Sequence, residues 1–392
     1  MMLRGFITIL IVMLLFACAP AKIIIEPNTM RMEPKAGQLE RDSKKSSVPD
    51  NILAVKLFDA AYDYFAEGLL EEALLYFNTL VERFPKDIHV SDSLYNAGLI
   101  YHKQAKYQAA LEKYLQVVKT NYNNKDVLDA HFRLLACMHE LKLWQETLDR
   151  VQMIKTGWPI IEADDRVELE VRKGVALFGL GEIEESKVQL LSAWQDYEIG
   201  LRKDEVINEF PGALAAYTLA MIERKSFMVV KLVLAEKKQM MLVLEKKAQY
   251  LQNAQDWLMK CIAQDNAYWA TAAGNQIGRL YHDFYEQIRN VEIPANLKGN
   301  IEESSMYKCM LLDMVKVLLK KAMRIYGRTI DMGQRLRVRN RWTDKTKEDL
   351  QKVEKLYLED IKRCEGVLPS EEVLEEIRQN NHHSGGESLT NE

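Results

Sequence analysis

The sequence lacks the short motifs that mark the common catalytic and cofactor sites. It has no glycine-rich phosphate-binding loop, no Gly-x-Ser-x-Gly segment and no His-Glu-x-x-His segment. These absences remove the usual sequence support for nucleotide-dependent enzymes, serine hydrolases and zinc proteases. The five cysteines show no Cys-x-x-Cys spacing, which argues against a structural zinc site. We therefore expect no catalytic residues, no metal ligands and no cofactor.

An excess of charge of one sign is also missing. The chain carries 53 Lys and Arg residues against 57 Asp and Glu residues. A chain this balanced is not built as a general nucleic-acid binder, so we expect no nucleic acid among its partners. Its 48% hydrophobic and 28% charged residues are typical of a globular protein, and its length allows two domains or one elongated array.

Long hydrophobic runs are absent after the first residues of the chain. At the N-terminus, Arg4 precedes a nearly unbroken apolar stretch from Phe6 to Phe16, which is followed by Ala17 and Cys18. The stretch is well short of the roughly 20 residues that a membrane-spanning helix needs. A positive start, a short apolar run and a small final residue predict a secretory signal over residues 1–17. An uncut membrane anchor is the alternative.

The end of this signal resembles the lipobox of bacterial lipoproteins, although Phe16 stands where that pattern has a smaller residue. In that family the signal is cut before the cysteine, whose thiol and new amino group are then acylated. The resemblance implies that Cys18 is the site of lipid attachment; an ordinary signal is the alternative. Enterobacterial lipoproteins retained in the inner membrane have Asp at the next position. Ala19 stands there, so the resemblance implies the periplasmic side of the outer membrane.

Residues 18–50 combine the lipidated cysteine with a segment rich in proline and polar residues. Such a segment cannot bury enough apolar surface to offset the entropy lost on ordering. We expect a flexible tether with a coil dimension of roughly 30 Å and a full stretch of about 110 Å. The body of the protein can then sit clear of the membrane.

The remaining cysteines are Cys137, Cys261, Cys309 and Cys364, which lie far apart in helical patterns. Free cysteine is often simply buried in a core. An oxidising periplasm would permit disulfides, but spacing cannot assign the pairs. We expect four buried thiols, with a single bridge as the alternative.

Residues 54–161 contain an internal repeat. Three equally spaced positions, Ala73, Ala110 and Thr147, anchor it. Each anchor is preceded by a small or apolar residue and followed by a large one, in the pairs Ala61 and Phe77, Gly98 and Tyr114, and Leu135 and Val151. Small residues on a first helix let a second helix approach, and each helix pair leaves an apolar face that its neighbour covers. A further unit is expected around Ser186.

This pattern resembles the tetratricopeptide repeat, whose unit is 34 residues, with a few residues added between units. The resemblance covers residues 52–161 closely and 165–200 loosely. It implies an all-α fold, an α-α superhelix, over residues 51–200. The longer spacing, with Phe84-Pro85 and Asn121-Tyr122 closing repeats, is similar to that of two periplasmic types. These are the repeat lipoprotein of the outer-membrane β-barrel assembly machine and the repeat protein that coordinates the Tol-Pal system.

Residues 201–365 predict a further helical, repeat-like region. It comprises a helix pair over 212–264, a break between Glu292 and Leu297, a helix from about 300 to 330 and a final helix over 343–364. A short helix and a disordered tail are expected over 366–392. A lipid anchor, a repeat array and a long helical extension together resemble repeat lipoproteins of gliding-motility systems.

The concave face of the repeats is one candidate partner surface. In the repeat family this face is lined by the first helix of each pair. Carried over to this chain, the groove residues are Phe58, Tyr62, Tyr95, Leu99, His102, Phe132 and His139. Aromatic side chains in a groove suit the capture of an extended or helical peptide. The alternative is that several of them pack against the second helix of their own unit.

A basic segment over residues 320–347 is the second candidate surface. It holds ten Lys and Arg residues against the two acids Asp331 and Asp344. Its densest part is the alternating run Arg335, Arg337, Arg339 and Arg341. Such a segment on a lipid-tethered protein suits contact with anionic lipid head groups, peptidoglycan acids or an acidic partner. The alternative is a solvated face paired with the Glu-rich ends of neighbouring helices.

These features favour a non-catalytic protein–protein interaction scaffold anchored by lipid to the outer membrane. We expect it to act in a periplasmic, envelope-spanning complex of the motility or Tol type. The expected partners are other envelope proteins or peptides, the outer membrane through the lipid anchor, and peptidoglycan as a further candidate. One alternative is an assembly factor for outer-membrane β-barrels or a pilus secretin. A second is a cell-wall-associated enzyme, which would need a catalytic fold beyond the array.

Overall fold

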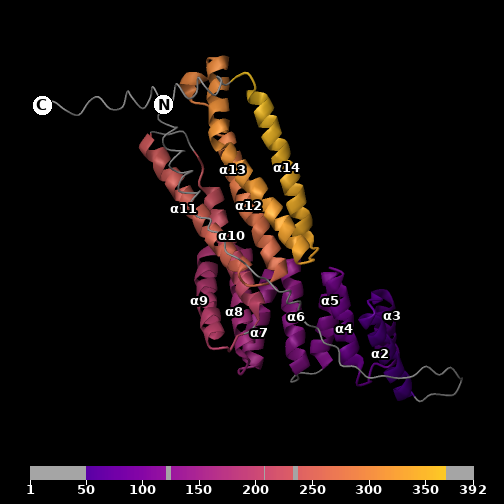
Figure 1. The fold of residues 1–392 in the computed structure, drawn as a ribbon. Coiled ribbons are helices and arrows are strands. Elements are labelled where there is room, and N and C mark those ends of the chain that lie inside the picture. The colour runs from indigo at the N-terminus through magenta and orange to yellow at the C-terminus, as the bar shows by residue number, and fades with distance from the viewer. Residues whose placement is uncertain (1–49, 121–124, 207, 233–236, 368–392) are drawn as a thin grey trace. The chain divides into compact units, whose positions relative to one another are not determined.

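A computed structural model describes residues 50–120, 125–206, 208–232 and 237–367 (Figure 1). The predicted signal, the lipid site Cys18, the tether up to residue 49 and the tail from residue 368 lie outside these ranges. Throughout the described ranges the regular structure is helical, with no strand. The predicted all-α fold is therefore confirmed. No helix in these ranges is long and apolar enough to cross a bilayer.

Residues 50–211 belong to one compact unit built from helix pairs. Its helices are α2 (Asp50–Ala66), α3 (Leu70–Arg83), α4 (Val90–Lys103), α5 (Tyr107–Thr120), α6 (Lys125–Leu141), α7 (Trp144–Gly157), α8 (Ala163–Leu180) and α9 (Ile183–Arg202). Each helix packs chiefly against the helices before and after it in the chain. Contacts limited to chain neighbours are the signature of a solenoid, so the predicted repeat architecture is confirmed.

The repeat is visible in the turns that join the two helices of each pair. Gly68, Ala105, Lys142 and Gly181 occupy equivalent positions, and all four have a positive φ, between 57° and 91°. This left-handed residue ends the first helix and reverses the chain. The loosely predicted fourth unit belongs to this series through Gly181. Its two helices, α8 and α9, are joined by a 2.7 Å hydrogen bond that Ser186 donates to the carbonyl oxygen of Gly174.

Residues 212–367 belong to a second compact unit. Its elements are α10 (Glu209–Val229), which begins at the unit boundary, α11 (Lys237–Ile262), α12 (Ala267–Arg289), the 3-10 helix η1 (Ala295–Leu297), α13 (Ile301–Arg335) and α14 (Arg341–Cys364). Here α12 is the central helix, because it packs against α11, α13 and α14. Gly278 lets α13 approach closely, since a Cβ there would meet the Tyr326 ring at 2.3 Å.

Buried polar groups fix α14 on α12. Arg289 Nε and Nη2 donate three hydrogen bonds to the Asp360 carboxylate, at 2.8–3.1 Å, and Tyr285 Oη donates to Asp360 at 2.6 Å. Near the other end of α14, Asn275 Nδ2 donates to Asp349 at 3.1 Å. Buried polar groups need such partners, so these contacts set the register of the two helices.

The four cysteines of the helical body divide into two kinds. Cys309 and Cys364 form a disulfide between the start of α13 and the end of α14, with their Cα atoms 5.4 Å apart. Cys137 and Cys261 are free and buried. The expectation of four buried thiols is thus wrong for one pair, and the single-bridge alternative holds. Spacing alone did not show it because α13 and α14 run antiparallel over most of their length before the two residues meet.

Candidate interaction surfaces

Three aromatic residues of the predicted groove occupy equivalent positions in α2, α4 and α6. The Phe58 ring stacks on His89, with centroids 4.7 Å apart, and meets Phe77 edge-on at 6.0 Å. Phe132 is buried in a cluster that includes Val151. Both rings therefore pack against the second helix of their own unit, which leaves them little surface for a partner.

Tyr95, the third of these residues, packs its ring edge-on against Tyr114 at 5.7 Å. Its hydroxyl donates to the Asp129 carboxylate and accepts a 3.1 Å hydrogen bond from Arg133 Nε. Burial, reinforced by Asp129, raises the pKa of Tyr95 well above its usual value, so it stays neutral. The resulting polar cluster joins α4 to α6 and remains partly open, because the Asp129 side chain is 47% exposed.

The other predicted groove residues, Tyr62, Leu99, His102 and His139, are partly exposed. His102 lies edge-on to Tyr107, and its Nδ1 is 3.6 Å from Cys137 Sγ. Burial lowers the pKa of His102, with Arg133 and Arg172 adding to the shift. His139 packs edge-on against Trp144 at 5.6 Å. Tyr62 and Leu99 are thus the partly exposed residues of the set for which no ring contact within the described ranges was found above.

An acidic patch near the start of α8 was not predicted as a partner surface. Burial raises the pKa of Asp165 to about 6, and Glu168, Glu162, Asp164 and Asp129 add to the effect. Asp164 and Asp165 lie in the first turn of α8, where acidic residues favour the positive end of the helix dipole. The sequence gave no sign that Asp129, on α6, lies near enough to act on Asp165. No group of three or more His, Cys, Asp or Glu side chains in the described ranges is placed to hold a metal ion.

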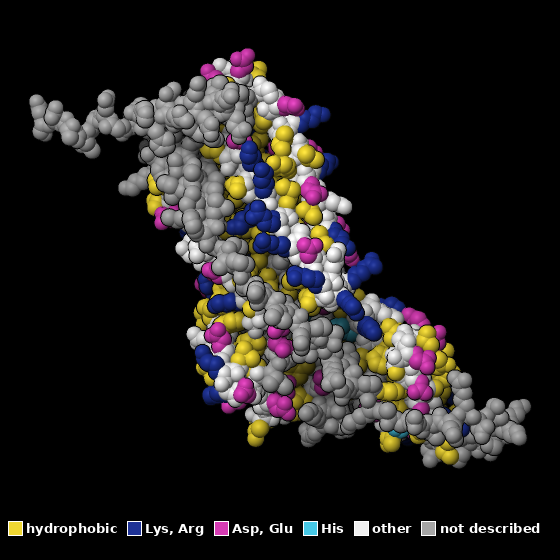
Figure 2. Space-filling view, in the orientation of Figure 1, with side chains coloured by type: hydrophobic (Ala, Val, Ile, Leu, Met, Phe, Trp, Pro, Cys, Tyr) yellow, Lys and Arg dark blue, Asp and Glu magenta, His cyan; other side chains and the backbone are white. Residues whose placement is uncertain are grey.

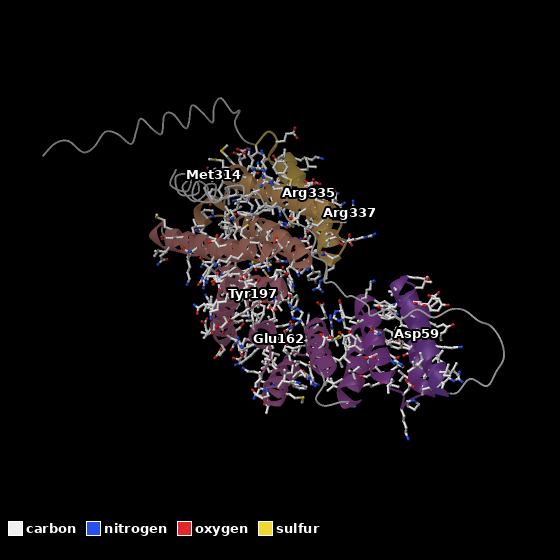
Figure 3. All side chains as sticks on the ribbon, turned by 60° about the horizontal axis from the view of Figure 1, so that its bottom comes forward. Asp59, Glu162, Tyr197, Met314, Arg335 and Arg337 are labelled. Carbon is white, nitrogen blue, oxygen red and sulfur yellow. A yellow bond between two sulfur atoms is a disulfide. The ribbon has the colours of Figure 1, made fainter. Side chains whose placement is uncertain are left out.

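The predicted basic surface lies where α13 turns into α14. Arg335 ends α13, Arg341 begins α14, and Arg337 and Arg339 stand in the loop between them; all four are exposed. We call residues 335–341 the arginine loop. Figure 3 shows Arg337 extending away from the helices near Arg335.

The arginine loop is held by hydrogen bonds at both ends. At its start Val338 N donates to the Gly333 carbonyl oxygen at 2.9 Å, and Arg337 adopts a left-handed φ of 52°. At its end Asn340 Oδ1 accepts from the backbone N–H groups of Trp342 and Thr343, and Thr343 Oγ1 accepts from Asn340 N. A capping box of this kind fixes the direction in which the chain enters the helix.

The cations of this region differ in their partners. Lys345 pairs with Glu348 and Asp349, and Lys347 pairs with Asp344. Arg341 lies over the rings of Tyr268 and Trp342 at about 5.5 Å.

In contrast, Arg335, Arg337 and Arg339 form no ion pair with an acid of the described ranges. The alternative, in which the cations pair with acids of the same chain, therefore describes the start of α14 but not the arginine loop. Figure 2 shows Lys and Arg side chains gathered in a band over α13 and toward this loop.

No protein-family model matches the chain, and no curated protein matches it. Among solved structures, a tetratricopeptide repeat protein from Parabacteroides merdae ATCC 43184 is 14% identical, with 78% of this chain and 98% of that chain covered and a TM-score of 0.38. MamA from Desulfovibrio magneticus RS-1 is 16% identical, with 54% and 98% covered and a TM-score of 0.35. YrrB, a tetratricopeptide protein described as having an unusual peptide-binding site, is 18% identical, with 54% and 90% covered and a TM-score of 0.35. These values describe a likeness of helical-repeat architecture, which says nothing of partner or activity.

Proposed function

We propose that this chain is a non-catalytic scaffold for protein–protein interaction, held by a lipid on Cys18 at the periplasmic face of the outer membrane. In this proposal it acts within an envelope-spanning complex of the motility or Tol type. The arginine loop binds an acidic region of a partner protein, and the solenoid supplies a further contact through the partly exposed Tyr62 and Leu99.

The observation that carries the proposal is the arginine loop itself. Three of its exposed arginines have no acidic partner in the described ranges, although the neighbouring Lys345 and Lys347 do. Hydrogen bonds hold the loop at both ends, so binding costs little ordering of the backbone. Arginine is also the cation best suited to binding carboxylates in a bidentate manner.

Two features support the proposed location. The N-terminal sequence ends its apolar run with Ala17-Cys18, which resembles a lipobox. The Cys309–Cys364 disulfide is of a kind that persists in oxidising compartments such as the bacterial periplasm and is rare in the cytosol.

Crosslinking in cells, followed by capture from the outer-membrane fraction and mass spectrometry, tests the proposal. We expect Tol-like, motor or motility proteins to be recovered with the wild-type chain and lost with Arg337→Glu plus Arg339→Glu. The matched control is Lys86→Glu plus Lys103→Glu, which reverses two exposed cations of the repeat unit and should leave capture unchanged.

Other outcomes would overturn parts of the proposal. Recovery of β-barrel assembly or secretin components would favour the assembly-factor function. If a Cys18→Ser chain still fractionated with the outer membrane, the proposal that a lipid on Cys18 anchors the protein would be overturned. Digestion of purified cell wall by the chain would favour the alternative of a cell-wall-associated enzyme.

A further inference from the structure

The outer face of α14 carries aliphatic side chains where a packed helix usually carries polar ones. Leu358 is 65% exposed and Ile361 is 48% exposed, although α14 packs against both α12 and α13. In contrast, Asp349 and Asp360 are buried on the face that α14 turns to α12. A helix with a single contact face buries its aliphatic side chains there. The described part of the chain thus leaves a second contact face on α14 uncovered.

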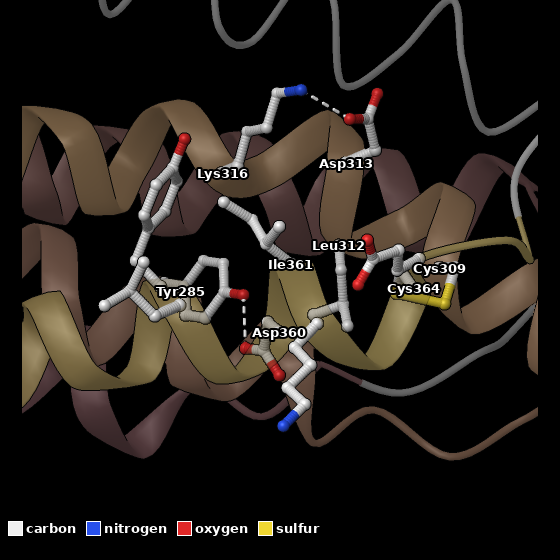
Figure 4. A pocket seen from close by; sticks show the side chains of 12 residues that line it. Tyr285, Cys309, Leu312, Asp313, Lys316, Asp360, Ile361 and Cys364 are labelled. Atoms are coloured by element: carbon white, nitrogen blue, oxygen red, sulfur yellow. Dashed lines mark hydrogen bonds and ion pairs between the residues drawn. A yellow bond between two sulfur atoms is a disulfide. The ribbon is translucent and has the colours of Figure 1, made fainter. Parts of the chain in front are cut away.

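Two hollows adjoin these aliphatic side chains. One lies between α13 and α14 beside the Cys309–Cys364 disulfide and has a volume of about 710 Å³; its lining includes Leu312, Leu358 and Ile361 (Figure 4). The other lies on α14 and has a volume of about 460 Å³. Leu358 lines both hollows, so a helix laid across it finds room for its own side chains next to that leucine.

Two opposite charges flank Leu358 along the helix. Glu354 stands one turn before it and Lys362 one turn after it, and all three line the hollow on α14. Both charged side chains are exposed, and neither forms an ion pair with a described residue. The nearby Lys355 and Glu359, in contrast, pair with each other. The unpaired groups along this face thus run negative, apolar, positive, an order that is complementary to itself in reverse.

We propose that this face of α14 binds a second copy of the chain, with the two α14 helices antiparallel and a two-fold axis passing close to Leu358. In such an arrangement Leu358 of each copy meets its counterpart. Residues four positions before it lie level with residues four positions after it on the other copy. Glu354 then faces the partner's Lys362, and symmetry makes this contact twice. A parallel pair would instead set like charges against each other, which is unfavourable.

The size of the contact predicts its strength. An interface made chiefly by one helix of each copy is smaller than the roughly 1,200–2,000 Å² of a stable protein–protein interface. We therefore expect a weak, reversible dimer. Its affinity comes from burying Leu358 and Ile361 of both copies, and the charges fix its antiparallel direction.

Sedimentation velocity of the purified full-length chain tests the proposal over about 1 µM to about 1 mM, the range of weak association. The average mass should rise toward that of a dimer. Leu358→Asp places a charge at the centre of the contact and should raise the dissociation constant at least about tenfold. The matched control is Val188→Asp on α9, whose wild-type side chain is 70% exposed and which should leave association unchanged. Thermal unfolding should show that both variants remain folded.

Charge reversal tests the antiparallel register. Glu354→Lys gives a chain with two cations on this face, and Lys362→Glu gives a chain with two anions. Each should associate at least about tenfold more weakly than wild type at low salt. An equimolar mixture of the two should regain association, because each cation of one variant then faces an anion of the other. Glu184→Lys, at an exposed position of α9, controls for the change in net charge.

A cysteine at a two-fold axis lies beside its own counterpart. Leu358→Cys should therefore form a disulfide between two copies under mild oxidation, visible as a dimer on a non-reducing gel. Val188→Cys, which is exposed to a similar degree, should not. Both variants are made in a Cys18→Ser chain, whose remaining free cysteines are buried.

The contrary outcomes are distinct. A chain that stays monomeric up to about 1 mM would leave this face to a different partner and overturn the proposal. Association that persists in Leu358→Asp would place the contact on another surface, with the same consequence. If the two charge variants failed to associate when mixed, or if Leu358→Cys gave no dimer, the antiparallel contact through α14 would be wrong.

Discussion

Gly98 on α4 lies directly against the ring of Tyr114 on α5, so closely that a Cβ on Gly98 would meet Tyr114 Cε1 at 2.6 Å. Tyr114 is fully buried, and its ring cannot move aside without disturbing the cluster that includes Leu94 and Val117. The glycine is therefore required for the close approach of the two helices.

Gly98→Ala should destabilise the chain by about 1–3 kcal/mol, the usual cost of overpacking a core. Urea unfolding followed by circular dichroism measures it. Gly157→Ala is the control, since nothing lies within 4 Å of a Cβ at that position. It should change the stability little or raise it by up to about 1 kcal/mol. Equal effects of the two substitutions would contradict the packing assigned to Gly98.

Phe132→Ala should cost about 3–5 kcal/mol, because Phe132 is 9% exposed and packs with Val151 and Ile154. Tyr95→Phe keeps the ring and removes one hydroxyl, so its cost should be about 1 kcal/mol. Thermal unfolding of both variants checks the order. If Phe132→Ala left the melting temperature unchanged while abolishing partner capture, Phe132 would be a groove residue after all.

Reduction of the Cys309–Cys364 disulfide should lower the stability of the second unit. The bridge spans a sequence separation of 55 residues, for which the chain-entropy account gives about 4 kcal/mol. Unfolding with and without dithiothreitol measures the effect, and Cys309→Ser should become insensitive to the reductant. If dithiothreitol lowered the stability of Cys309→Ser as much as that of wild type, the loss of stability would not come from this disulfide.

His131 should make the repeat unit less stable in mild acid. It is buried against Trp158, and Arg150 Nη1 lies 3.3 Å from its Nδ1, so its pKa falls from 6.5 to about 4. Since the unfolded chain takes up the proton first, stability is full above about pH 6.5 and falls as the pH drops toward 4. Between pH 7 and pH 5 the loss should be about 2 kcal/mol.

Asp165 acts in the opposite direction, because its pKa is raised to about 6 and its protonation favours the folded chain as the pH falls. The contribution of His131 must therefore be taken as the difference between wild type and His131→Gln. Urea unfolding at pH 7 and pH 5 gives that difference. A variant that loses as much stability as wild type would exclude His131 as the cause.

Charge reversal in the arginine loop should weaken association with the proposed acidic partner mainly by slowing it. Arg337→Glu with Arg339→Glu should lower the association rate about tenfold at low salt and reduce its salt dependence. Surface plasmon resonance across a salt series measures both effects once the partner has been captured. A wild-type rate that does not change with salt would rule out an electrostatic role for the loop.

The sequence specified the repeat unit well because its signal is local. Ala61, Ala73 and Phe77 recur at equal spacing with their counterparts, and all three are fully buried. The left-handed turn was partly hidden, since Ala105 and Lys142 stand where the other units have glycine.

The second unit and the candidate surfaces were less predictable because their contacts are distant in sequence. Nothing near Cys309 indicates that Cys364 is its neighbour. An aromatic residue such as Phe132 has the same helical position whether it faces a groove or the next helix. By contrast, the arginine loop could be found from the sequence, because closely spaced arginines are visible in the sequence itself. That these arginines lack acidic partners in the described ranges could be seen only in the structure.

The chain-neighbour packing of the repeat unit has a mechanical consequence. If the lipid on Cys18 holds the protein, any pull between membrane and partner enters the array at α2, whose principal neighbour is α3. Elements joined in series each bear the whole load, so the terminal hairpin should yield first while later ones stay folded. The unit centred on α12 shares its load among several helices in parallel. The protein would then lengthen in steps near the membrane and stay rigid at the arginine loop, the proposed partner site.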